Sequence, residues 1–183
     1  WILARPMTGF AETFAQYAME VAPGGGSDRP EPEPGAEAAL FVLAGELSLS
    51  LGKQEHRLTV GGFAYVPPET DWRVCNAGDQ PLHFLWIRKA YEPVSGLPYP
   101  DAIVSHEQEV EAVAMPETEG AWATTRFIDP DDLRHDMHVN IVTFAPGGVI
   151  PFMETHVMEH GLYVLEGKGV YRLNERWVEV EAG

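Results

Sequence analysis

A short stretch of the 183-residue sequence carries side chains whose types and spacing suit a metal ion. Glu154 and His156 are two residues apart, so on a strand their side chains face the same way. His160 follows a short turn and begins the next apolar run, from which it can swing back alongside them. One carboxylate and two imidazoles on one face form a facial triad with open positions for water and substrate. The alternative is a solvated polar strand with two incidental histidines.

The chemistry of this triad suits a hydrolytic metal site without selecting one metal. Neutral imidazoles and a carboxylate bind Mn(II), Fe(II), Ni or Zn. A metal-bound imidazole nitrogen cannot carry protons, so His156 and His160 are predicted to be ligands only. Glu154 is predicted to be a ligand and also the catalytic residue that moves protons. Glu159 is predicted to point away from His160, towards the surface.

The elements that position this triad are predicted to be β-strands. The sequence has 15 prolines and 18 glycines, which divide it into short β-rich runs. This pattern indicates a sandwich or barrel rather than alternating strands and helices. One helix is predicted over 105–114, with Ser105 as its cap and Gln108 completing a capping box. Strands are predicted at Leu40–Leu43, Leu47–Leu51, Gly62–Val66, Leu82–Ile87, Met137–Phe144, Leu162–Leu165 and Gly169–Leu173.

An internal repeat organises these strands. At a shift of 122 residues Leu40–Leu43 falls on Leu162–Leu165, and at a shift of 123 Ala22–Gly25 falls on Ala145–Gly148. Two homologous β domains are therefore predicted, at 10–92 and from 122 to 183, joined by a linker at 93–121 that holds the helix. The second repeat reaches Gly183 where the first continues for about 30 residues, so we expect the sequence to lack part of its second domain. Chance reuse of leucine, valine and glycine is the alternative.

The spacing around the triad resembles a known family. Five residues separate Gly148 from Glu154, and six residues separate His160 from Gly167, as in the first motif of the cupin superfamily. Cupins usually have the order His-x-His and then Glu, whereas this chain has Glu154, His156 and then His160. That permutation resembles the (S)-ureidoglycine aminohydrolase family, two-cupin enzymes of allantoin breakdown in purine catabolism. The expected fold class is all-β, with tandem cupin (double-stranded β-helix) barrels of which the second is truncated.

The resemblance implies a manganese enzyme that hydrolyses (S)-ureidoglycine to (S)-ureidoglycolate and ammonia. It implies that Glu154, His156 and His160 bind the metal, with a Gln expected beyond Gly183 as the fourth ligand. It also implies that Tyr171 contacts the substrate, although Tyr171 could instead be a core aromatic residue. The family pattern Asn-x-His on the preceding strand is inverted here to His138-Val-Asn140.

The first repeat is predicted to bind no metal. Its positions equivalent to the triad are Pro32, Pro34 and Ala38, none of which has a side chain that can bind a metal. Trp72 stands where the fourth ligand would be. This repeat is expected to pack against the second one, to make oligomer contacts or to shield the active site.

Composition limits the partners. The formal net charge of −16 argues against nucleic acid and against an anionic membrane surface, and no apolar run is long enough to span a membrane. Cys75 is the single cysteine, and the sequence opens without an initiator Met or a signal-peptide pattern. We expect a cytoplasmic protein with a small-molecule substrate, and the resemblance implies a homo-oligomer.

Two other functions stay open on the sequence. The same triad supports an Fe(II) dioxygenase or an isomerase, because a facial triad also activates oxygen. A cupin that binds a small ligand without catalysis is the third class, against which the intact triad argues. Ammonia release with Mn(II), compared with oxygen uptake with Fe(II), separates the first two classes.

Overall fold

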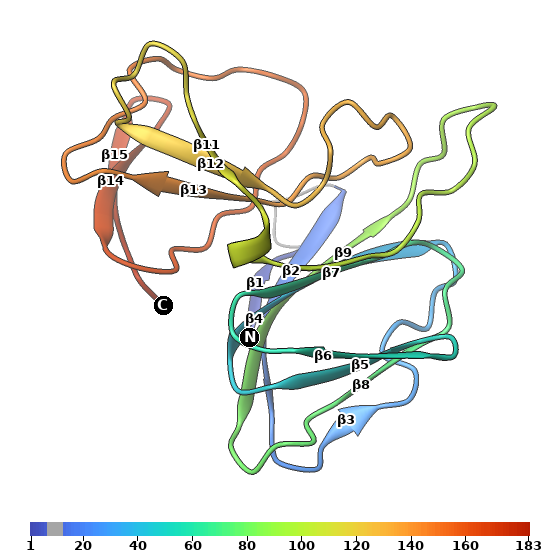
Figure 1. Cartoon of the computed structure of the whole chain (residues 1–183). Helices are drawn as coiled ribbons and strands as arrows, with labels where there is room; N and C mark the ends of the chain where they lie inside the picture. Colours follow the sequence, from blue (N-terminus) through green and yellow to red (C-terminus); the bar gives the residue numbers. More distant parts are fainter. Residues whose placement is uncertain (7–12) are drawn as a thin grey trace.

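The computed structural model describes residues 1–6 and 13–183, and it consists almost entirely of β-strands and loops (Figure 1). The all-β prediction is therefore confirmed. Within the described ranges, no helix has the length and apolar character needed to cross a membrane.

The first repeat is a two-layered sandwich of antiparallel strands. Its layers pack across a core in which Leu40, Leu47 and Leu49 are fully buried. The larger sheet contains, in spatial order, β1 (Ile2–Ala4), β2 (Phe14–Val21), β9 (Leu82–Ala90), β4 (Ala36–Ala44), β7 (Gly62–Val66) and β10 (Ile103–His106). The smaller sheet contains β3 (Gly26–Ser27), β8 (Trp72–Cys75), β5 (Leu47–Leu51) and β6 (Gln54–Leu58).

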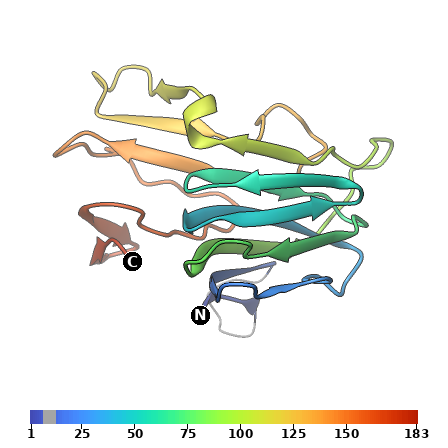
Figure 2. The ribbon, with the colours of Figure 1, turned by 60° about the horizontal axis from the view of Figure 1, so that its bottom comes forward.

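The second repeat supplies two smaller sheets. β11 (Ala112–Ala114), β12 (Trp122–Arg126) and β13 (Asn140–Phe144) form one, and the hairpin of β14 (Lys168–Leu173) and β15 (Arg176–Glu181) forms the other. In Figures 1 and 2 the three-stranded sheet lies beside the first repeat, and the hairpin stands at the outer end of the second.

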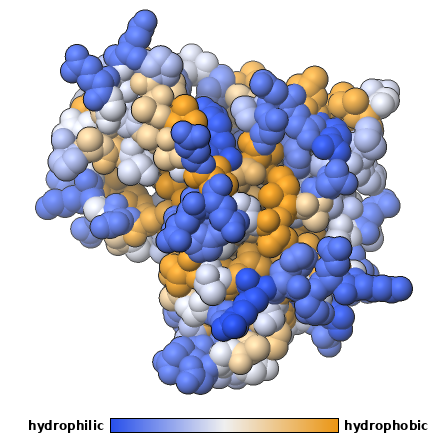
Figure 3. All heavy atoms as spheres, in the orientation of Figure 1, coloured by the Kyte–Doolittle hydropathy of each residue, from blue (hydrophilic) through white to orange (hydrophobic). Residues whose placement is uncertain are grey.

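The central strand β4 is buried on both faces, and this joins the two repeats. Alternate residues Ala38, Leu40 and Val42 face the inside of the first sandwich. The residues between them face the second repeat in a second apolar cluster, where Phe63 and Phe127 stack with ring centroids 4.4 Å apart. Apolar side chains gather along the middle of the molecule in Figure 3. We call this second group the interface cluster; its buried members are Ala39, Phe41, Phe63, Tyr65, Leu85, Phe127, Ile128 and Met137.

The repeat found in the sequence is also present in the backbone. At the shifts of 122 and 123 residues, β2, β5 and β6 fall on β13, β14 and β15. The amide of Gly61 donates to the carbonyl of Val42 at 3.0 Å, and that of Gly183 donates to Val164 at 3.3 Å. Positive φ recurs at three pairs of glycines: Gly24 and Gly147, Gly45 and Gly167, and Gly61 and Gly183.

The helix predicted over 105–114 is wrong. Residues Ile103–His106 form β10, residues Glu107–Glu109 form a 3-10 turn (η2), and Ala112–Ala114 form β11. The open edge of β7 explains the difference, because its unpaired backbone groups bind β10 in register, from Ile103 opposite Tyr65 to His106 opposite Gly62. A ten-residue helix is too short to compete with such pairing.

The strand predicted at Leu162–Leu165 is also wrong, since these residues have no regular structure. Their counterparts in β4 are paired on both sides by β7 and β9. Within the described residues, no strand pairs with Leu162–Leu165 in this way. Strand β13 begins at Asn140 rather than at Met137. The predicted domain start at residue 10 lies outside the described residues, and the other domain boundaries stay predictions.

A pair of carboxyl groups is buried where the repeats meet. Glu37 on β4 is fully buried and accepts a hydrogen bond from the Tyr65 hydroxyl at 2.6 Å. Asp136 of the second repeat forms an ion pair with Lys89 and accepts a bond from the Glu92 amide at 2.8 Å. Burial, together with a hydrogen bond to Asp136, raises the pKa of Glu37 to about 9. Near neutral pH, Glu37 is therefore protonated and Asp136 is ionised.

Replacing Glu37 with Gln should make the protein less sensitive to alkaline pH. Between the ordinary pKa of 4.5 and about 9, folded Glu37 holds a proton that the unfolded chain has lost. The free energy of unfolding therefore falls by about 1.4 kcal/mol per pH unit across this range through this group alone. Glu37→Gln removes that slope while its amide still donates to Asp136.

Urea unfolding at several pH values from 5 to 9 measures the effect. The stability of Glu37→Gln relative to wild type should rise steadily with pH. Glu20→Gln, on the exposed side of β2, is the control and should leave the profile unchanged. If the free energies of unfolding of wild type and Glu37→Gln changed in parallel with pH, the prediction that buried Glu37 is protonated would be wrong.

Candidate metal centre

The structure brings Glu154, His156 and His160 together in the loop between β13 and β14. One donor atom from each residue lies within 4.8 Å of the others. The two imidazole rings have centroids 4.6 Å apart and are tilted by 55°. All three side chains are exposed. Among the described residues, this is the group of His, Cys, Asp and Glu side chains that could hold a metal ion.

The donor atoms lie close enough together to be drawn onto one divalent cation. Ligands on one face of an ion, about 2.2 Å from it, lie roughly 3.1 Å apart, and no two ligands can be more than about 4.4 Å apart. The observed limit of 4.8 Å is wider, so the side chains must close in when an ion binds. A carboxylate with two imidazoles is also a donor set that transition metals prefer. The residues present therefore fit the expected metal.

The backbone that carries the triad differs from the sequence prediction. Glu154 and His156 lie in a segment without regular structure rather than on one face of a strand. The loop of residues 145–167, here called the ligand loop, holds all three residues. The three side chains therefore come together because of the course of the loop backbone and not because they share one face of a strand.

The first repeat indicates which way these side chains face. Ala38, the counterpart of His160, points into the core of the first sandwich. Pro32 and Pro34, the counterparts of Glu154 and His156, line a cavity of about 440 Å³ together with Trp72. Two of the three triad positions and the predicted fourth position therefore line one pocket in the first repeat, and the third position faces the adjoining core.

Tyr171 lies on β14, opposite Val178 of β15, and its side chain is 41% exposed. Its counterpart in the first repeat is Leu49, which is fully buried in the sandwich core. The repeat therefore puts Tyr171 on the inward face, the same face as His160. The structure records no hydrogen bond of its hydroxyl within the described residues, so a substrate role stays a prediction.

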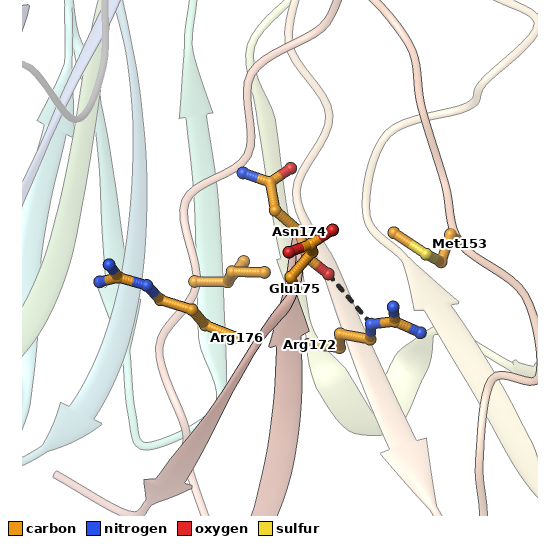
Figure 4. Close-up of a pocket in the computed structure, with 6 residues that line it drawn as sticks. Met153, Arg172, Asn174, Glu175 and Arg176 are labelled. Atoms are coloured by element: carbon orange, nitrogen blue, oxygen red, sulfur yellow. Dashed lines mark hydrogen bonds between the residues drawn. The ribbon is translucent and has the colours of Figure 1, made fainter.

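A hollow of about 630 Å³ lies next to the turn between β14 and β15 (Figure 4). Met153, the residue before Glu154, faces this turn across the hollow. Arg172 donates from Nε to the carbonyl of Asn174 at 3.0 Å, and its guanidinium lies 5.7 Å from the Trp177 ring centre. Arg172 and Arg176 outnumber the one acidic residue of this rim, Glu175, so the rim carries a small positive charge in a chain whose net charge is −16.

Glu159 is not the outward-facing surface residue that the sequence predicted. It is half-buried, and its Oε2 accepts hydrogen bonds from the backbone amide of Thr13 at 2.8 Å and from the Thr13 hydroxyl at 2.7 Å. Its link to the first repeat was missed because spacing within the motif says nothing about distant partners. The repeat held the signal, since it aligns Glu159 with the buried Glu37.

Comparison with known proteins gives a consistent result. The cupin domain family matches residues 17–88 and 140–183. (S)-Ureidoglycine aminohydrolase of Escherichia coli is 30% identical over 182 residues, which cover 100% of this chain and 68% of that protein. A probable (S)-ureidoglycine aminohydrolase of rice is 32% identical over 159 residues, which cover 86% of this chain and 50% of that protein. The chain thus spans about two thirds of the bacterial relative and half of the plant relative.

Two solved structures match the whole chain. A Pseudomonas aeruginosa protein named for its induction by glyoxylate is 63% identical, with a TM-score of 0.92 and 68% of its chain covered. The Escherichia coli protein Ylba is 30% identical, with a TM-score of 0.86 and 70% of its chain covered. These likenesses extend over both repeats.

If the triad binds a metal ion, Mn(II) should raise the thermal unfolding midpoint of the protein. A ligand present at 100 times its dissociation constant stabilises the folded state by about 2.7 kcal/mol. His160→Ala removes one of three donors and should abolish the Mn(II)-dependent shift, which differential scanning calorimetry measures. Val157→Ala, at a fully exposed position within the same loop, should keep it. An undiminished shift in His160→Ala would place the metal elsewhere.

Proposed function

The chain belongs to the cupin family and, within it, to the (S)-ureidoglycine aminohydrolase family, and from this premise we propose that it hydrolyses (S)-ureidoglycine. The products are (S)-ureidoglycolate and ammonia, as in the breakdown of allantoin. The observation that carries the proposal is the meeting of Glu154, His156 and His160, with donor atoms within 4.8 Å of one another. A likeness to the enzyme that includes both repeats supports it.

We propose Mn(II) as the metal, held by Glu154, His156 and His160. The donor set also accepts Fe(II), Ni or Zn, so manganese rests on the family rather than on affinity. A bound divalent metal supplies Lewis acidity and lowers the pKa of water at the site. The remaining steps fall to side chains of the chain itself.

The three ligands have different capacities for proton transfer. His156 and His160 would each hold the metal through a ring nitrogen, so they orient the site without carrying protons. Glu154 has two oxygens, so one would hold the metal and the other would be available to accept a proton from the attacking water. It can then deliver that proton to the leaving amine, which departs as ammonia. Glu154 is therefore the proposed catalytic residue.

Tyr171 is the proposed substrate contact. Its counterpart in the first repeat, Leu49, is buried in the core, which supports a position of Tyr171 on the inward face of β14. A phenol hydroxyl can donate to the substrate carboxylate or ureido oxygen. Arg172 and Arg176 at the neighbouring rim supply positive charge that favours approach of an anionic substrate in an acidic protein. We also propose that the protein is cytoplasmic and forms a homo-oligomer.

Ammonia release from freshly prepared (S)-ureidoglycine tests the function. The protein should release ammonia above the spontaneous rate, lose this activity with a chelator and regain it with Mn(II). His156→Ala should lose more than the 10–100-fold in metal affinity that is typical of changes around a ligand, and with it the activity. Val157→Ala is the matched control.

The outcomes separate the site from the substrate. Activity that survives chelation, or an unchanged rate and metal content in His156→Ala, overturns the site. Metal binding without ammonia release retains the site and overturns the substrate. Oxygen uptake with Fe(II) would then favour the dioxygenase reaction, for which the same triad is suited.

Tyr171→Phe should raise KM for (S)-ureidoglycine while metal content stays at the wild-type level. Loss of one hydrogen bond to a charged group costs about 1.5–3 kcal/mol, which corresponds to roughly 10–150-fold in kcat/KM. Steady-state kinetics at saturating Mn(II) measures the effect. Tyr99→Phe removes a hydroxyl from an exposed tyrosine of the linker and should be neutral. Unchanged kinetics in Tyr171→Phe would assign this residue to packing alone.

A further inference from the structure

We infer that Glu159 is a positioning residue that ties the ligand loop to Thr13 of the metal-free repeat and so holds His160 in place for the metal. The inference rests on the proposed function of the triad. It assigns to the first repeat a direct part in building a site to which it contributes no ligand.

The contact between Glu159 and Thr13 is specific. A single carboxylate oxygen, Oε2, accepts one hydrogen bond from the Thr13 amide at 2.8 Å and another from its hydroxyl at 2.7 Å. Hydrogen bonds to an ionised carboxylate are about twice as strong as neutral ones. Thr13 lies 146 residues away in sequence, so the contact fixes the ligand loop against a distant element.

The residues after His160 are held by the same part of the first repeat. A Cβ added to Gly161 would lie 3.0 Å from Cε2 of Phe14 and closer still to Oε1 of the buried Gln16. Glycine at this position therefore lets the loop lie directly against β2. Tyr163 packs on the interface cluster. His160 thus stands between anchors at the residues immediately before and after it.

The opposite arm of the loop, which carries Glu154 and His156, is different. Phe152, Met153 and Val157 are exposed, with Val157 at 99%. The two ligands on this arm therefore have freedom to adjust, whereas His160 is the fixed ligand. Holding one ligand in advance lowers the entropy that metal binding must remove.

The internal repeat supports the inference independently. The shifts of 122 and 123 residues align Glu159 with Glu37, and Thr13 with Asp136. Both pairs join a carboxyl group of one repeat to a residue of the other. The pair of Glu37 and Asp136 needs a bound proton, because both members are acids. In the second pair, Thr13 supplies both donors, so the contact itself needs no proton on Glu159.

Mn(II) affinity measured by titration calorimetry on the protein tests the inference. Glu159→Ala should weaken Mn(II) binding about 10–100-fold, the range found for residues that orient a ligand. Glu159→Gln should recover much of the loss, since its amide oxygen still accepts both bonds. Thr13→Val keeps the amide donor but removes the hydroxyl, and should fall between wild type and Glu159→Ala. Val157→Ala is the control.

A merely structural role would give a different pattern. The inference expects the urea unfolding midpoint without metal to change little while Mn(II) affinity falls. It also expects Thr13→Val and Glu159→Ala together to weaken binding no more than Glu159→Ala alone, because both remove one contact. Wild-type affinity in Glu159→Ala, or additive losses in the double variant, overturns it. Wild-type protein that binds no Mn(II) overturns the proposed metal function, and with it the inference.

Discussion

The packing of the interface cluster is the interaction on which the rest of the structure depends. Both faces of the large sheet in the first repeat are apolar, because β4 places Leu40 on the inner face and Phe41 on the outer face. An exposed outer face of that kind would present a large apolar patch to water. Phe127, Ile128 and Met137 of the second repeat cover it. The apolar interface therefore determines where the ligand loop can lie.

Burial at this interface also determines the charge states of the polar groups within it. Glu37 cannot reach bulk water, so it retains a proton, while Asp136 keeps its charge beside Lys89. Glu159 is only half-buried and meets two donors rather than another acid. Equivalent carboxyl groups of the two repeats thus meet different partners. Glu37 meets another acid, whereas Glu159 meets the amide and the hydroxyl of Thr13.

The sequence predicted what depends on local spacing. Period-two alternation predicts β5, and the motif spacing groups Glu154, His156 and His160, whose donor atoms lie within 4.8 Å of one another. It did not predict what depends on distant partners. The segment at 105–114 pairs with β7 instead of forming a helix, and Leu162–Leu165 lacks the neighbours that β4 has. Glu159 was misplaced for the same reason, since an alternating strand was assumed where a loop docks on Thr13.

This dependence on distant partners explains why a repeat without ligands would be kept beside one that has them. A loop with no strand pairing cannot by itself hold three donors near one point, because its backbone entropy opposes the ordered state. The first repeat supplies a rigid surface, since β2 is fully paired with β9 and lies next to the interface cluster. Thr13 and Phe14 stand at the start of that strand, where the residues on either side of His160 meet them. Although Pro32 and Pro34 have no metal-binding side chains, the first repeat therefore still gives the ligand loop a rigid surface to lie on.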